Sequence, residues 1–117
     1  MTEIETIEQI DTVLAGTEQQ PILIYKHSTA CPTSFSAKRR LTEFLKSASE
    51  SGTALPAVYF VNVIESRKVS QAIAERLDVP HKSPQILLVD QGRCRWNTSH
   101  YEITGENIEK ALHEMAA

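Results

Sequence analysis

The sequence of 117 residues has few of the features that mark several large protein classes. Its apolar runs are all far shorter than the roughly 20 residues that a membrane-spanning helix needs. The formal net charge of −3 is too small to indicate a nucleic-acid or membrane-surface partner. The four glycines form neither of the glycine-rich motifs that hold nucleotide phosphates. We therefore expect a protein that binds no nucleic acid, no membrane and no nucleotide.

Cysteine is also scarce, with only Cys31 and Cys94 in the chain. Neither belongs to the paired Cys or His spacing of a structural zinc site, so we expect no metal. Residues 1–8 are acidic and lack the basic and apolar segments of a signal peptide, which predicts a cytoplasmic protein with free thiols. The length is enough to bury a core without a disulfide, and we expect a single domain over residues 1–117.

Apolar residues at helical and strand spacings alternate along the chain. Strands joined by helical crossovers, followed by an antiparallel hairpin, predict an α/β fold with a central mixed sheet of four or five strands and helices on both faces. A short strand near Ile4 would be the fifth. The predicted helices are residues 5–15, the segment from Pro32 to a stop at 51–52, and the segments that Ser66 and Thr104 can cap; the predicted strands are 21–25, 57–64, 85–90 and 93–98.

Cys31 lies where the first apolar run meets the long amphipathic helix. Pro32 fits the first turn of that helix, which places Cys31 at or beside its N-cap. The unpaired N–H groups there favour a thiolate, and a lowered pKa also makes the sulfur a better leaving group. The basic cluster 38–40 lies about 10 Å or more along the helix, and we expect it to be a solvated face with a secondary role at most.

Ser34 occupies the position where many redox enzymes carry a second cysteine. A hydroxyl cannot form a disulfide, so Cys31 has no resolving partner in this motif, although Ser34 can donate a hydrogen bond to its sulfur. Cys94 follows the predicted turn at 91–92, and the strand 85–90 alone separates it from Pro84 by about 20 Å. A disulfide requires Cα atoms within about 7 Å. We expect Cys94 to be a structural thiol and oxidised protein to carry no Cys31–Cys94 bridge.

Four side chains near the predicted site leave two interpretations open. Lys26 and His27 can bias the charge of Cys31 or contact a bound thiol, or they can be a solvated strand end and a packing residue. The hairpin returns the chain toward Pro84 by residues 99–101, so His100 can form a wall of a thiol-binding groove or pack locally. Tyr101 can form part of the same wall, but a ring that packs on the last helix is the favoured interpretation.

The junction cysteine, the motif Cys31-Pro32-Thr33-Ser34 and the strand-opening Pro84 together resemble the thioredoxin superfamily. With residues 25–28, Ser83-Pro84-Gln85, Cys94 and Ser99-His100, the chain resembles more narrowly the YtxJ-like monothiol bacilliredoxins, in which isoleucine often stands in place of Thr33. The resemblance implies a thioredoxin-like fold and a cis Ser83–Pro84 bond against the reactive sulfur. The resulting candidates are Cys31 and Ser34 for catalysis and Lys26, His27, Pro32, Thr33, Ser83, Pro84 and His100 for substrate binding.

The same resemblance implies removal of bacillithiol from protein mixed disulfides, in a response to stress. The expected partners are S-thiolated client proteins and bacillithiol or another low-molecular-weight thiol as co-substrate, with no tightly bound cofactor and a monomeric chain. A different class of function stays open: a thioredoxin-fold binding or stress-adaptor module whose Cys31 is modified without turnover. Recovery of a client thiol that depends on Cys31 would distinguish the two.

Overall fold

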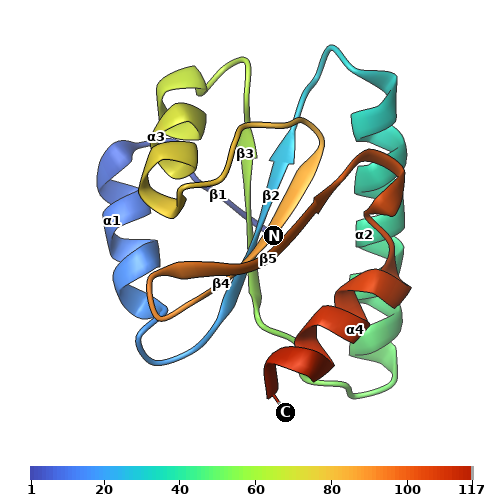
Figure 1. Cartoon of the computed structure of the whole chain (residues 1–117). Helices are drawn as coiled ribbons and strands as arrows, with labels where there is room; N and C mark the ends of the chain where they lie inside the picture. The colour runs from blue at the N-terminus through green and yellow to red at the C-terminus, as the bar shows by residue number, and fades with distance from the viewer. Residues whose placement is uncertain (117) are drawn as a thin grey trace.

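The computed structural model describes residues 1–116, which form one five-stranded mixed sheet with helices on both faces (Figure 1). The strands are β1 (Thr2–Glu3), β2 (Ile22–His27), β3 (Ala57–Asn62), β4 (Gln85–Asp90) and β5 (Arg93–Ser99), and the helices are α1 (Ile7–Gly16), α2 (Pro32–Glu50), α3 (Arg67–Leu77), α4 (Gly105–Ala116) and the 3-10 turn η1 (His100–Glu102). The order across the sheet is β1-β3-β2-β4-β5. This arrangement confirms the predicted α/β class and the fifth strand near the N-terminus.

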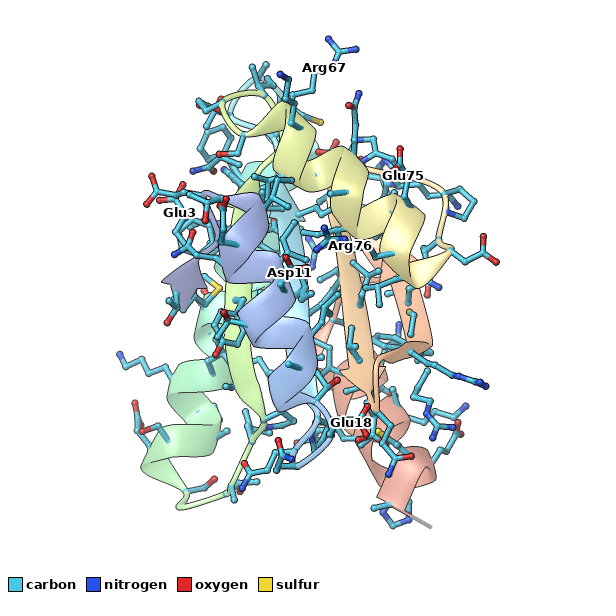
Figure 2. All side chains as sticks on the ribbon, turned by 90° about the vertical axis from the view of Figure 1, so that its left-hand side faces the viewer. Glu3, Asp11, Glu18, Arg67, Glu75 and Arg76 are labelled. Carbon is cyan, nitrogen blue, oxygen red and sulfur yellow. The ribbon has the colours of Figure 1, made fainter. Side chains whose placement is uncertain are left out.

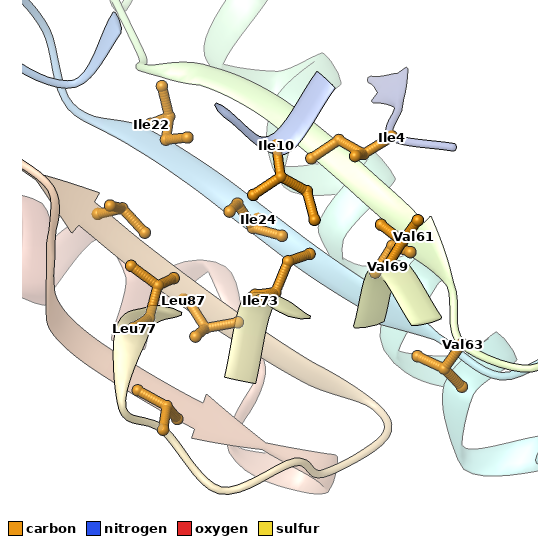
Figure 3. Packing of buried hydrophobic residues seen from close by; sticks show 12 residues of the cluster. Ile4, Ile10, Ile22, Ile24, Val61, Val63, Val69, Ile73, Leu77 and Leu87 are labelled. Atoms are coloured by element: carbon orange, nitrogen blue, oxygen red, sulfur yellow. The ribbon is translucent and has the colours of Figure 1, made fainter. Parts of the chain in front are cut away.

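β2 is the central strand and is buried along its whole length. It pairs in parallel with β3 and antiparallel with β4. Ile22 and Ile24 pack in the core on the face covered by α1 and α3 (Figure 3), whereas Leu23 and Tyr25 pack on the face covered by α2 and α4. The continuous apolar run therefore predicted the two-sided burial of this strand correctly.

The helix ends follow the local sequence signals. Thr6 and Gln9 form a reciprocal capping box at α1. Thr104 accepts a hydrogen bond of 3.1 Å from the Asn107 N–H at the start of α4, as predicted. α2 ends at Glu50, before Gly52 adopts a φ of 73°, a conformation that glycine takes at little cost.

Two connections differ from the predictions. β3 ends at Asn62 rather than at residue 64, because the chain turns there and the Ser66 N–H donates to the Asn62 carbonyl at 2.8 Å. Ser66 directly precedes α3 as expected, but among the described residues its side chain forms no capping hydrogen bond. The turn η1 after β5 was not predicted.

The pairing of the strands brings the candidate site residues to one end of the sheet. The register joins Lys26 to Gln85 and His27 to Asn62, so the end of β2 meets the end of β3 and the start of β4. Cys94 pairs with Val89 near the opposite end of the sheet. Within residues 1–116, none of the helices is both long enough and apolar enough to span a bilayer.

Candidate active site

Cys31 is the N-cap residue of α2, as the sequence predicted. Its backbone is extended, with φ −117° and ψ 117°, and Pro32 begins the helix directly after it. The side chain is partly exposed, and the thiol is free. The sulfur therefore lies at the positive end of a 19-residue helix, within reach of solvent.

Hydrogen-bond donors in the first turn of α2 favour the thiolate form of Cys31. The Ser34 N–H contributes most to lowering its pKa, followed by the Thr33 hydroxyl. Slight burial acts in the opposite direction, while the Thr33 N–H and the Ser34 hydroxyl add to the lowering. Thr33 and Ser34 thus both favour the thiolate, but the Ser34 hydroxyl, which we expected to donate to the sulfur, contributes least.

Ser34 is fully buried and connects the motif to β2. Its Oγ accepts a 3.2 Å hydrogen bond from the Ser28 N–H, and its carbonyl accepts a 2.8 Å bond from the Tyr25 hydroxyl. Since that hydroxyl has one proton, its oxygen accepts from the His27 Nδ1, which lies 3.1 Å away. These bonds hold the first turn of α2 on the central strand.

His27 is 3% exposed and its ring meets that of Phe35 edge-on at a centroid distance of 5.0 Å. Burial, followed by the charge of Lys38, lowers the pKa of His27, so the ring is neutral at physiological pH. His27 is thus a packing residue in this structure, and contact with a bound thiol stays a prediction. Tyr25 was missed as part of the site, although a tyrosine in an aliphatic strand signals a hydroxyl that needs a buried partner.

Lys26 points to the opposite face of the sheet from α2. Its side chain is fully buried, and its Nζ donates to the Ser70 carbonyl at 3.2 Å and lies 3.2 Å from the Nδ1 of His81. Burial lowers the pKa of Lys26 to about 8. The interpretation of Lys26 as a solvated strand end is therefore wrong, because β2 is central and α3 covers this face. Contact with a bound thiol stays a prediction.

The loop before β4 carries Ser83 and Pro84, and the peptide bond between them is cis, as the resemblance implied. Pro84 is buried, and its carbonyl accepts a 3.1 Å hydrogen bond from the His100 N–H. The hairpin thus returns the chain beside Pro84 as predicted. The buried Oγ of Ser83 has no hydrogen-bond partner among the described residues.

The turn η1 presents its side chains differently from the prediction. His100 is exposed and has a left-handed φ of 55°, which is uncommon outside glycine. Tyr101 is 76% exposed, so the expectation that its ring packs on the last helix is wrong. The cause is that β5 ends at Ser99 and the 3-10 turn directs the next residues outward.

Arg40 fastens α2 to this turn. Its Nε donates to the Ile103 carbonyl at 2.8 Å, and a terminal nitrogen donates to the His100 carbonyl at 2.9 Å. The prediction of a solvated face is correct for Lys38 and Arg39, which are exposed, and wrong for Arg40. These two carbonyl partners lie 60 and 63 residues away in the sequence, at positions that no local pattern indicates.

Cys94 lies on β5, at the end of the sheet remote from Cys31. Burial raises the pKa of its thiol, which packs against the core on the α1 and α3 face and donates to the Trp96 carbonyl at 3.3 Å. Among residues 1–116, no three His, Cys, Asp or Glu side chains gather as a metal site would require.

Comparison with known proteins identifies a family model and solved structures that are similar to this chain. Residues 2–108 match the family model described as monothiol bacilliredoxin BrxC. A solved thioredoxin-fold protein assigned as an oxidoreductase superposes with a TM-score of 0.80 at 27% identity, covering 95% of this chain and 92% of that one. Thioredoxin from Fasciola hepatica has a TM-score of 0.71 at 11% identity, with 97% and 98% of the two chains covered. Mitochondrial thioredoxin 3 from Saccharomyces cerevisiae superposes with a TM-score of 0.69 at 16% sequence identity, covering 97% of this chain and 94% of that one. These thioredoxins confirm the thioredoxin-like fold.

Proposed function

Because the chain belongs to the monothiol bacilliredoxin family, we propose that it removes bacillithiol from protein mixed disulfides by thiol exchange at Cys31. Its family and fold make it a thiol-disulfide oxidoreductase. One observation carries the finer proposal: the partly exposed thiol with a lowered pKa has a serine, Ser34, at the fourth position of its motif. An exchange enzyme built in this way takes its second thiol from solution.

In the first step, the Cys31 thiolate attacks the bacillithiol sulfur of a client mixed disulfide. The client–bacillithiol S–S bond breaks as the Cys31–bacillithiol S–S bond forms, and the client sulfur leaves as a thiolate that takes a proton from water. The donors from Ser34 and Thr33 lower the pKa of Cys31 and so favour the thiolate that makes this attack. The number of disulfide bonds does not change in this step.

In the second step, the thiolate of another bacillithiol molecule attacks the bacillithiol sulfur bound to Cys31. Cys31 leaves as a thiolate, and bacillithiol disulfide is released. Reduction of the client–bacillithiol disulfide to two thiols takes two electrons, and the joining of two bacillithiol thiols into bacillithiol disulfide supplies them. A lowered pKa at Cys31 makes it the better leaving group in this step. The cycle needs the low-molecular-weight thiol as co-substrate and no tightly bound cofactor.

The mixed disulfide would lie in a groove between three segments. Pro32 and Thr33 come from the start of α2, Ser83 and Pro84 from the loop before β4, and His100 from η1. The Ser83 hydroxyl is buried and has no hydrogen-bond partner within the described residues. We assign the protein to cytoplasmic thiol repair under oxidative stress.

The test uses a bacillithiolated client protein incubated with this protein and bacillithiol. We expect client thiols to recover faster than in the uncatalysed control, with Cys31 carrying the mass of one bacillithiol during turnover. Cys31→Ser should abolish the acceleration, and the matched control Cys94→Ser should retain it. Equal recovery with the wild type and Cys31→Ser would refute the enzyme, and modification of Cys31 without client recovery would support the adaptor module instead.

A further inference from the structure

A cavity of about 410 Å³ lies at the active-site end of the sheet, on the face opposite α2. It opens between the segment after β3, the first turns of α3 and the loop that leads to Pro84. The Val63 N–H donates to the His27 carbonyl at 2.9 Å, which fixes one wall beside the end of β2. The volume is within the usual range for small-molecule sites. The lining residues are Val63, Ile64, Arg67, Ser70, Gln71 and His81.

A buried positive charge lies directly behind this lining. Lys26 has no exposed surface, and its Nζ contacts Ser70 and His81. Within residues 1–116, no carboxylate comes within 4.0 Å of that nitrogen. With a pKa of about 8, Lys26 is about nine-tenths protonated at pH 7. A buried ammonium without a counter-charge is costly, and an anion in the adjoining cavity would offset that cost.

The hydrogen bonds of His81 determine which of its ring nitrogens carries the proton. An ammonium group has no lone pair, so Lys26 donates and the His81 Nδ1, 3.2 Å away, accepts. The ring proton therefore lies on Nε2. Burial, followed by the charge of Lys26, lowers the pKa of His81, which keeps the ring neutral. Among the described residues no hydrogen bond engages Nε2, so its N–H is a donor available to a ligand.

The remaining walls complement a small organic acid. Val63 and Ile64 offer apolar surface for a carbon skeleton. Arg67 is the first residue of α3, and its guanidinium lies at the outer end of that helix, at the rim of the cavity (Figure 2). The cavity thus has a buried positive charge behind its lining, a neutral N–H donor and an exposed arginine at its mouth, groups that suit a carboxylate.

We propose that this cavity is a subsite for a carboxylate of the low-molecular-weight thiol that completes the exchange cycle. The proposal rests on the proposed function, because it assigns the bound acid to the co-substrate of Cys31. His81 lies three residues before Pro84, so a thiol anchored here is held beside the loop that borders the active site. Lys26 then acts through the electrostatic attraction of its buried charge, and His81 contacts the acid.

A binding experiment tests the subsite without any turnover. Succinate is titrated into Cys31→Ser protein, and the ring signals of His81 and the amide signals of Ser70 and Gln71 are followed by NMR. We expect saturable shifts with succinate and none with its neutral analogue succinamide. Lys26→Met should weaken succinate binding at least 10-fold, whereas Lys68→Met, which removes an exposed charge from α3 outside the cavity, should change it less than twofold.

If Lys26→Met does not fold, His81→Phe carries the test, because it keeps the ring and removes the donor. It should weaken succinate binding about fivefold or more. Equal shifts with succinate and succinamide, or binding that neither substitution weakens, would overturn the carboxylate subsite.

A kinetic experiment tests whether the carboxylate bound in the cavity belongs to the low-molecular-weight thiol that releases Cys31. Mercaptosuccinate and neutral 1-thioglycerol are compared as the thiol that releases Cys31 from its mixed disulfide. We expect His81→Phe to raise KM for mercaptosuccinate about fivefold, with kcat and the KM for thioglycerol unchanged. A raised KM for the client alone would show that the acid belongs to the client and overturn the assignment. A wild type without turnover would refute the proposed function, while the succinate titration still decides the subsite.

Discussion

At the scale of single residues, Thr33 places a hydroxyl beside the reactive sulfur. After the Ser34 N–H, this hydroxyl does most to lower the pKa of Cys31. Thr33→Ile keeps the β-branched shape and removes the donor, so we expect the pKa of Cys31 to rise. Alkylation by iodoacetamide, followed by mass spectrometry at a series of pH values, should show the Cys31 reaction shifted to higher pH.

Thr29→Val is the matched control for that substitution. The Thr29 hydroxyl donates to the Glu65 carboxylate at 3.0 Å and does not act on the sulfur. Its alkylation profile should coincide with that of the wild type. Cys94 should react slowly in all three proteins because burial raises its pKa. A Thr33→Ile profile identical to the wild type would show that the hydroxyl does not stabilise the thiolate.

The burial of Lys26 leads to a second prediction for a single residue, which concerns the stability of the fold. Burial lowers its pKa from 10.5 to about 8, so between these pH values the unfolded chain holds a proton that the folded chain has released. The free energy of unfolding should therefore rise with pH across that window, and below pH 8 the full cost of about 3 kcal/mol should apply. Lys26→Met should be roughly 2 to 3 kcal/mol more stable than the wild type at pH 7.

The difference in free energy of unfolding between Lys26→Met and the wild type should shrink toward zero as the pH rises from 8 to 10.5. Urea denaturation at intervals of half a pH unit measures it. Lys68→Met, which alters an exposed lysine of α3, should run parallel to the wild type throughout. If the difference in free energy of unfolding between Lys26→Met and the wild type did not vary with pH, burial of the ammonium would not destabilise the protein.

At the scale of elements, the start of α4 presses closely on α2. A Cβ added at Gly105 would lie 2.7 Å from Cδ1 of Phe44, closer than packed carbon atoms tolerate. Gly105→Ala should therefore lower the free energy of unfolding by about 1 to 3 kcal/mol, since α4 or the ring must move. Gly16→Ala at the end of α1 is the control.

A Cβ at Gly16 meets nothing within 4 Å among the described residues. That substitution should leave stability unchanged or raise it by up to about 1 kcal/mol, through the better helix propensity of alanine. Chemical denaturation of both variants gives the comparison. If Gly105→Ala proved as stable as Gly16→Ala, the contact between the two helices would be looser than the structure has it.

The order of the elements was predictable because each one carries its own local signal. Apolar periodicity marked the helices, continuous apolar runs marked the buried strands, and Pro32 marked the N-terminus of α2. The burial of Lys26, the bonds of Arg40 and the outward turn of Tyr101 were not predictable in this way. Each depends on partners that are distant in the sequence or on a turn without a distinctive composition.

At the scale of the whole molecule, the sheet keeps the two thiols apart. Cys31 follows the C-terminal end of β2, and Cys94 pairs with Val89, which itself pairs with Ile22 at the other end of that strand. The length of β2 alone amounts to about 17 Å, well beyond the roughly 7 Å between Cα atoms that a disulfide allows. Diamide oxidation of the monomer should therefore produce no Cys31–Cys94 bridge on non-reducing peptide mapping.

Ser34→Cys provides the positive control for that mapping. The Ser34 N–H donates to the Cys31 carbonyl at 3.0 Å, so the two residues flank a tight turn that holds their Cα atoms within about 7 Å. This variant should form an internal 31–34 disulfide under the same oxidation. A 31–94 bridge in the wild-type monomer would instead supply an internal resolving thiol and contradict the monothiol cycle.

The separation of the two thiols also determines how this protein responds to the redox state of its surroundings. A dithiol enzyme oxidises within itself, so its midpoint potential does not depend on the supply of small thiols. In the proposed cycle the oxidised form of Cys31 includes a thiol taken from solution, and the concentration of that thiol enters the equilibrium. The midpoint should shift by about 30 mV for each tenfold change in free thiol. The fraction of oxidised protein therefore reports both the potential of the thiol pool and its size.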